Sequence, residues 1–301
     1  METAQPAVRL DGVQFTTDRF RLGPIHLEVP RGYVTAIVGP NGSGKSSTFR
    51  LLLDLIKPEA GTIELLGSRP HSRNPELRQR LAYVPETNSD CDEGLRASEK
   101  AAFHQLWYPT WDVNRYQELL RRFDVDPSVR LGKMSKGMRQ KLELALALAH
   151  QPELLLLDEP SSGLDPIAWK HMLETLSRYM EDGSRTILVA SHLIEEVRRL
   201  ADYIVVMSRG QVLGVYEKDA LFDNWRTYYL IGDGLEERML TQGPGVHAVE
   251  RMGGQAYKLI SSASQSTEQW LHREALPVTG QQPMELDDIM EALIARQQPF
   301  S

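Results

Sequence analysis

Three features are scarce in this chain of 301 residues: cysteine, long apolar runs and an excess of positive charge. Cys91 is the single cysteine, so no disulfide can form within the chain, which fits a reducing compartment. Because no segment reaches about 18 uninterrupted apolar residues and residues 1–10 lack a signal-peptide core, we expect the chain neither to span nor to cross a membrane by itself. A net charge of −7 disfavours the basic surface that nucleic-acid binding usually requires.

The composition is otherwise that of an ordinary globular protein. Hydrophobic residues make up 41% of the chain and charged residues 25%, and the length suffices for one large core with a small appended unit. The chemistry must therefore be read from motifs.

The most informative motif lies where a predicted strand meets a predicted helix. The stretch Tyr33–Val38 is apolar and rich in β-branched residues, whereas Lys45–Ile56 has helical spacing of its apolar positions. Glycines at such a turn let backbone N–H groups wrap a polyphosphate, and the helix N-terminus adds partial positive charge. We therefore predict a nucleotide-phosphate site made of Gly39, Pro40, Asn41, Gly42, Ser43, Gly44, Lys45, Ser46 and the following Ser47.

Two side chains of this loop carry its chemistry. Lys45 would reach the β- and γ-phosphates, and the Ser46 hydroxyl would ligate Mg²⁺. A merely structural glycine-rich turn is the alternative, which the complete spacing and the correct flanks disfavour.

A second motif is the apolar run Leu154–Leu157, which is followed by Asp158 and Glu159. The run is short and ends near a proline, which favours a buried strand over a helix. In an open parallel sheet ligands bind at the carboxyl ends of the strands, so this edge can lie beside the phosphate loop. Asp158 would then hold Mg²⁺ through water, and Glu159 would orient and deprotonate the attacking water.

The third motif is a predicted buried strand, Thr186–His192, that ends in histidine. A lone histidine is more often structural than catalytic. This one ends a strand that should run parallel to the Asp158 strand, so we predict that His192 contacts the γ-phosphate and the attacking water.

In this order the three motifs resemble the ATP-binding subunits of ABC transporters, over roughly residues 8–216. The resemblance implies ATP and Mg²⁺ as cofactors and an α/β fold: a P-loop NTPase of the ABC ATPase type, with an antiparallel β subdomain and a helical subdomain at about 87–150. We expect this domain to cover 1–225. A hairpin signal at Gly253-Gly254 and two helical patterns predict a small α+β accessory domain at 226–301.

The family's signature sequence has its counterpart in Met134–Met138, which departs from the common form at both ends and at Lys136. The resemblance implies that two subunits stack head to tail, so that Ser135 and Gly137 of one contact the nucleotide held by the other. Asp165 would lie in the loop that passes between the two sites. Simple helix caps are the alternative for Ser135 and Asp165, and a homodimer and a heterodimer are equally compatible with the sequence.

Two positions depart from the family pattern. Glu86 stands where the family usually has glutamine; a carboxylate can still ligate Mg²⁺, although it adds negative charge near the phosphates. The usual adenine-stacking aromatic falls near Thr16 or Thr17, so we assign Phe15 to this role, with Phe20 as the alternative.

The insertion after Glu86 carries the signal for the partner. The pattern at residues 107–112, together with the signature, resembles the bacterial exporter branch that handles drugs, peptides or lipids. This implies an integral membrane permease as partner, a second ATPase subunit, and a peripheral location on the cytoplasmic face of the cell membrane, with no nucleic acid. Trp107, Tyr108 and Trp111 are either core residues or part of a docking groove, and Thr110 is read as a helix N-cap.

Two other functions remain open at this point. A soluble ABC-type ATPase acting on nucleic acid or ribosomes would use the same motifs. A low-turnover nucleotide-binding regulator is the other, because Glu86 and the altered signature could slow hydrolysis.

Overall fold

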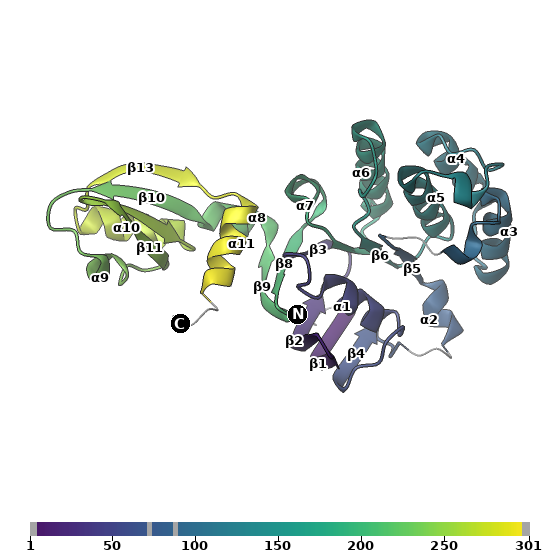
Figure 1. Ribbon diagram of the computed structural model, residues 1–301, viewed down its shortest axis with the longest axis horizontal. Helices are drawn as coiled ribbons and strands as arrows, with labels where there is room; N and C mark the ends of the chain where they lie inside the picture. Colours follow the sequence, from purple (N-terminus) through teal and green to yellow (C-terminus); the bar gives the residue numbers. More distant parts are fainter. Residues whose placement is uncertain (1–4, 71–73, 87–89, 297–301) are drawn as a thin grey trace. The chain divides into compact units, whose positions relative to one another are not determined.

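The computed structural model describes residues 5–70, 74–86 and 90–296, and its elements are labelled in Figure 1. The chain divides into two compact units, one ending at Val215 and the other beginning at Tyr216. This division falls before the expected boundary at residue 226. Helix α8 (Lys218–Asn224) belongs to the second unit, where it contacts α10 (Ser264–Arg273).

A six-stranded sheet forms the centre of the first unit, with the strand order β5-β6-β7-β3-β8-β9. The pairs from β5 to β8 are parallel, and every residue of β3, β6 and β7 is buried, as expected for strands covered on both faces. The predicted buried strands are therefore confirmed. The strands are β3 (Val34–Val38), β5 (Leu81–Val84), β6 (Leu154–Asp158), β7 (Thr186–Ala190), β8 (Tyr203–Ser208) and β9 (Gln211–Glu217).

Strand β7 lies between β6 and β3 in this sheet. Because all three strands are parallel, their carboxyl ends meet at one edge, and the three sequence motifs follow those ends. Helices α1 (Lys45–Leu52), α2 (Pro75–Gln79), α6 (Pro166–Met180) and α7 (Ile194–Leu200) connect the strands.

A three-stranded antiparallel sheet, ordered β2-β1-β4, forms the predicted β subdomain. Its strands are β1 (Val8–Thr17), β2 (Phe20–Val29) and β4 (Ala60–Leu65). Leu10 and Ile25 of this sheet share one apolar core with Phe49 of α1 and Leu156 of β6. Burial of this shared surface fixes the phosphate loop, which precedes α1, against both sheets.

The helical subdomain consists of α3 (Ala97–Trp107), α4 (Val113–Phe123) and α5 (Lys136–Ala149), with the short 3₁₀ turns η1 (Asp90–Asp92) and η2 (Leu131–Lys133). Figure 1 shows α3 and α4 beside α5, which both contact. Asp92 accepts hydrogen bonds from Lys100 Nζ at 2.8 Å and Arg139 Nη2 at 2.6 Å, and Lys100 also pairs with Glu143 at 2.5 Å. Mostly buried charges therefore join η1, α3 and α5.

The expected N-cap of α4 needs correction. The N-cap of α4 is Asp112, whose carboxylate accepts a hydrogen bond from Arg115 N at 3.0 Å. The Thr110 hydroxyl instead donates to the carbonyl of His150 at 2.6 Å. The aromatic residues near the end of α3 differ in their surroundings. The Tyr108 ring stacks on His150 with 3.8 Å between ring centroids, whereas Trp107 is 63% exposed.

The second unit is an α+β fold around a four-stranded antiparallel sheet, ordered β11-β12-β10-β13. The hairpin predicted at Gly253-Gly254 joins β11 to β12. The apolar core of the second unit includes Tyr228, Leu259 and Trp270. Sequence patterns missed β10 and β13. The remaining elements are β10 (Arg226–Ile231), α9 (Glu237–Leu240), β11 (Val246–Gly253), β12 (Ala256–Ser261), β13 (Val278–Pro283) and α11 (Leu286–Ala295).

Across residues 5–70, 74–86 and 90–296, none of the helices is both long enough and apolar enough to traverse a bilayer.

Leu155→Ala tests the central sheet, because Leu155 is fully buried in β6 between β5 and β7. Removal of its side chain should leave a cavity and lower the free energy of unfolding by about 2–5 kcal/mol. Urea unfolding followed by circular dichroism measures this change. Leu106→Ala is the control, since Leu106 is 84% exposed and should change stability by less than about 0.5 kcal/mol. Equal effects of the two substitutions would contradict the assigned core.

Candidate active site

The glycine-rich loop joins β3 to α1 and is tied down at several points. Gly44 is the N-cap of α1 with φ 112°, and the buried Lys45 donates from Nζ to the carbonyl of Gly39 at 2.8 Å. A Cβ at Gly39 would lie 2.1 Å from the carbonyl oxygen of Met207, so only glycine fits there. Gly210 N donates to Ser43 O at 2.9 Å, which fastens the loop to the turn between β8 and β9.

A cavity of about 620 Å³ opens beside this loop. Its volume lies in the range of small-ligand sites. The cavity is lined by Asn41, Gly42, Ser43, Gly44, Lys45, Ser46 and Ser47 together with Phe15, Thr17, Arg19, Phe20, Arg50, Ile56, Glu86 and Glu159. The predicted loop residues from Asn41 to Ser47 thus line one cavity with two carboxylates that follow other strands, whereas Gly39 and Pro40 are not among its lining residues.

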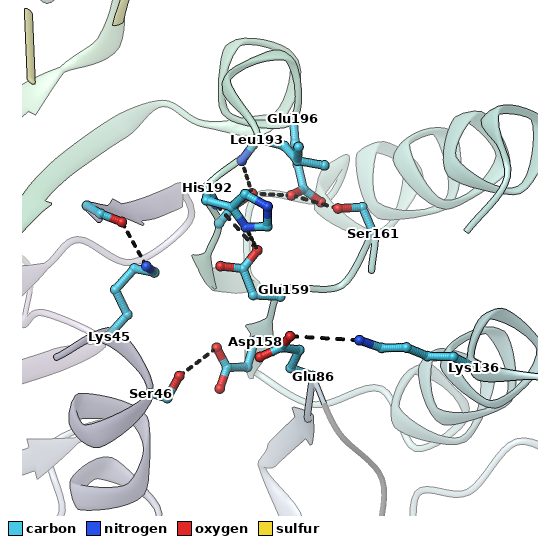
Figure 2. A network of polar contacts seen from close by, with 12 residues as sticks. Lys45, Ser46, Glu86, Lys136, Asp158, Glu159, Ser161, His192, Leu193 and Glu196 are labelled. Atoms are coloured by element: carbon cyan, nitrogen blue, oxygen red, sulfur yellow. Dashed lines mark hydrogen bonds and ion pairs between the residues drawn. The ribbon is translucent and has the colours of Figure 1, made fainter. Parts of the chain in front are cut away.

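Asp158 lies against the start of α1, as Figure 2 shows. Ser46 Oγ donates to Asp158 Oδ1 at 3.4 Å, and Tyr83 OH donates to Oδ2 at 3.4 Å. Burial raises the pKa of Asp158, and the nearby negative charges of Glu159 and Glu86 raise it further. The negative charges of Glu159 and Glu86 thus act on Asp158, which favours a cation beside it.

Glu159 and His192 form a direct pair at the ends of β6 and β7. The distance from His192 Nδ1 to Glu159 Oε2 is 2.6 Å, and the His192 backbone N–H donates to the same oxygen at 3.3 Å. Glu159 has φ 49°, a conformation that L-residues rarely adopt, and its backbone N–H donates to Ala190 O at 2.9 Å. Strained backbone of this kind concentrates at functional sites.

The two members of this pair differ in exposure. The Glu159 side chain is 9% exposed and that of His192 is 59% exposed. The Glu159 carboxylate is therefore largely removed from solvent and is bound by His192, whereas the exposed imidazole is free to contact a ligand.

Glu86 pairs with Lys136, the first residue of α5, at 3.8 Å between Nζ and Oε1. Both side chains are 45% exposed, so the pair adds at most about 1 kcal/mol to stability. Its interest is structural, because it joins the segment after β5 to the signature helix. No sequence signal linked these two residues, which lie on separate elements.

Ser135, Gly137 and Asp165 do not line the cavity that contains Lys45; Asp158 and His192 do not line it either, but they contact Ser46 and Glu159, which do. Ser135 Oγ accepts from Met138 N at 3.2 Å and caps α5, and Asp165 Oδ1 accepts from two backbone N–H groups at the start of α6. A Cβ on Gly137 would lie 2.3 Å from the carbonyl oxygen of Gly163, so these two loops are in close contact. Within one chain, the side chains of Ser135 and Asp165 act as helix N-caps.

The cavity lining includes residues that the sequence reading missed. Arg19 and Arg50 bring positive charge to a site that suits an anion, yet isolated arginines have no spacing signal. Phe15 and Phe20 both line the cavity, so the assigned aromatic and its alternative lie in the same place.

The donor set fits a hard divalent cation. Ser46, Asp158 and Glu86 provide oxygen atoms, the ligands that Mg²⁺ prefers. Within the described part of the chain, no three His, Cys, Asp or Glu residues are grouped so that they alone could hold a metal ion. That finding fits Mg²⁺, which usually keeps several waters and binds substrate phosphates as well as one or two carboxylates.

Comparisons with known proteins agree with this geometry. The family model described as ABC transporter matches residues 22–162, a range that contains the glycine-rich loop and Glu159. The bacitracin transport ATP-binding protein BcrA of Bacillus licheniformis is 32% identical over 206 residues, which cover 68% of this chain and 67% of that protein. The Nod factor export ATP-binding protein I of Rhizobium sp. (strain N33) is 28% identical over 301 residues, 97% of this chain and 98% of that protein.

A solved structure, that of an ATP-binding subunit of an ABC transporter, superposes with a TM-score of 0.65 at 28% identity. It covers 72% of this chain and 92% of that chain. The fold predicted for the first unit is therefore confirmed.

Gly137→Ala tests the close contact between the signature loop and the turn at Gly163. The new Cβ would meet backbone, which cannot rotate away, so the two segments must separate. We expect a loss of about 1–3 kcal/mol in unfolding free energy, the usual effect of overpacking, together with slower ATP turnover. Gly94→Ala is the matched control, because nothing lies within 4 Å of a Cβ there. Thermal unfolding curves that coincide for the two variants would refute the contact.

Proposed function

Because the chain belongs to the ATP-binding proteins of ABC transporters, we propose that it is the ATP-hydrolysing subunit of a bacterial exporter and drives transport through a separate membrane permease. The observation that carries this proposal is the meeting of Ser46, Asp158 and the Glu159–His192 pair at the ends of β3, β6 and β7. Such an arrangement can hold a triphosphate and activate a water beside it.

The export direction draws support from two sources. The residues at 107–112 and the signature resemble the exporter branch that handles drugs, peptides or lipids, and one full-length relative is named as a Nod factor exporter. The permease would hold the chain on the cytoplasmic face of the membrane. The exposed Trp107 lies on α3 of the insertion, which receives the permease in the family.

The proposed reaction is in-line attack of water on the γ-phosphate. Lys45 would bind the β- and γ-phosphates, and Ser46, Asp158 and Glu86 would hold Mg²⁺, which when bound neutralises phosphate charge. Glu159 orients the attacking water and accepts its proton, since it is the desolvated carboxylate of the cavity. His192 holds that carboxylate through Nδ1 and would contact the γ-phosphate.

A second subunit would complete the site. Ser135, Gly137 and Asp165 lie outside the cavity of their own chain, and the proposal assigns them to the nucleotide of the facing subunit. ATP would then lie between the phosphate loop of one subunit and the N-terminus of α5 in the other. Binding closes the dimer, and hydrolysis with product release reopens it.

A low-turnover nucleotide-binding regulator is the second candidate, favoured by the contact of Glu86 with Lys136. Steady-state phosphate release with and without Mg²⁺ separates the two functions. An active motor turns over many ATP molecules per subunit and stops when Mg²⁺ is chelated.

Glu159→Gln tests the proposed base. The amide keeps the size of the side chain but cannot take a proton, so turnover should fall roughly 10²- to 10⁴-fold while ATP affinity is retained. Phosphate release and fluorescent-nucleotide binding measure the two quantities. Glu181→Gln, at an exposed position after α6, is the control and should behave as wild type. Near-normal turnover in Glu159→Gln would remove Glu159 from the base role.

The same variant tests ATP-driven dimerisation. With Mg²⁺ and ATP, Glu159→Gln should elute from a size-exclusion column as a dimer. Because this variant hydrolyses ATP slowly, the nucleotide stays bound and the closed dimer persists. Addition of EDTA, or a further Lys45→Ala substitution that removes the buried phosphate ligand, should return it to the monomer position. A monomer under every ATP condition would count against the shared site.

A further inference from the structure

A buried carboxyl group lies beneath the Glu159–His192 pair and has no part in the mechanism above. Glu196, in the first turn of α7, is 0% exposed. Burial of an ionisable group is unfavourable unless hydrogen bonds compensate for the lost water. Glu196 is therefore expected to accept hydrogen bonds from neighbouring side chains.

One oxygen of Glu196 gathers two hydroxyl groups. Oε2 accepts hydrogen bonds from Ser161 Oγ at 3.3 Å and from Ser191 Oγ. Ser191 Oγ in turn accepts from Leu193 N at 3.1 Å, so its proton is directed to Glu196. Figure 2 shows these contacts directly beside the Glu159–His192 pair.

The two serines lie on the two segments that carry that pair. Ser161 follows Glu159 by two positions in the turn after β6, and Ser191 directly precedes His192 at the end of β7. A single oxygen of a buried side chain thus joins the segment that carries Glu159 to the segment that carries His192. The left-handed conformation of Glu159 needs such restraint, because surrounding structure must hold a strained residue in place.

We propose that Glu196 is a positioning residue for ATP hydrolysis, which fixes the segments of Ser161 and Ser191 relative to each other and so keeps the Glu159 carboxylate on His192. This inference rests on the roles proposed above for Glu159 and His192. Glu196 touches neither substrate nor metal in it, and acts through the two hydroxyls.

The charge state of Glu196 adds an independent signature. Burial, together with the negative charge of Glu159, raises the pKa of Glu196 to about 7, although the two serine hydroxyls and His192 oppose the rise. Its other oxygen, Oε1, is buried and has no hydrogen-bond partner within the described residues. The buried site therefore favours the protonated form of Glu196. The charged form, which becomes the major one above about pH 7, is repelled by the negative charge of Glu159.

The sign of the resulting stability effect follows from proton binding. In the unfolded chain Glu196 loses its proton near its ordinary pKa of 4.5, but in the folded chain, where its pKa is about 7, it keeps the proton to higher pH. Between these values the folded state binds more protons, so its stability falls as the pH rises through this window. Removal of the titrating group should flatten that part of the curve.

The test compares Glu196→Ala, Glu196→Gln and Ser191→Ala with the control Glu195→Ala, whose side chain is exposed on the same helix turn. We expect Glu196→Ala to lower kcat by about 10-fold or more, with KM and ATP affinity within about 2-fold of wild type. Glu196→Gln keeps an acceptor oxygen for both hydroxyls and should recover most of the turnover. Ser191→Ala should add little in the Glu196→Ala background, since both changes remove the same contact.

A pH series supplies a readout that a purely structural role would not change. Wild-type kcat should change near pH 7, the change should be absent in Glu196→Gln, and stability of this variant should vary less between pH 4.5 and 7. Should Glu196→Ala fail to fold, Ser161→Ala and Ser191→Ala with the Glu196→Gln profile carry the test.

Three outcomes would overturn the inference: unchanged kcat in Glu196→Ala, additive effects of the Ser191 and Glu196 substitutions, or glutamine no better than alanine. Glu159→Gln distinguishes this failure from failure of the proposed function. Slow turnover in Glu159→Gln together with normal Glu196 variants rejects only the positioning role. Normal turnover in Glu159→Gln rejects the proposed base itself.

Discussion

Parallel pairing of β6, β7 and β3 is the constraint on which the site depends. Each strand ends at the same edge of the sheet, and each is followed by one chemical component: Asp158 and Glu159, His192, and the phosphate loop. The apolar residues of these strands are buried on both faces, so the hydrophobic effect that stabilises the sheet also sets the distances between the polar groups at its edge.

Much of this could be predicted from the sequence, because short apolar runs with motifs at their ends report both the strand and the group it presents. The predicted strand Thr186–His192 begins where β7 begins, but β7 ends at Ala190, two residues before the histidine, and the ABC transporter resemblance is confirmed by the comparisons. The chemical roles of the site residues stay predictions. Their meeting in space depends on the order of the strands in the sheet, which periodicity alone does not give.

What the sequence could not predict depends on contacts between distant residues. Strands β10 and β13 pair across nearly the whole second unit, and β13 is mostly exposed, so it has no apolar alternation to reveal it. Thr110 and Asp112 are both competent caps, and only the fold selects Asp112, since Thr110 is engaged by His150. The Glu86–Lys136 pair and the Ser161–Glu196–Ser191 cluster likewise arise from tertiary packing.

The charge network of the helical subdomain has a mechanical consequence. Asp92, Lys100, Arg139 and Glu143 join η1, α3 and α5, and removing one partner from a buried ion pair costs about 3–5 kcal/mol. The network therefore favours α3 and α5 keeping one relative position. Because Lys136 at the start of α5 pairs with Glu86, which lines the nucleotide cavity, any displacement of the two helices together would reach that cavity.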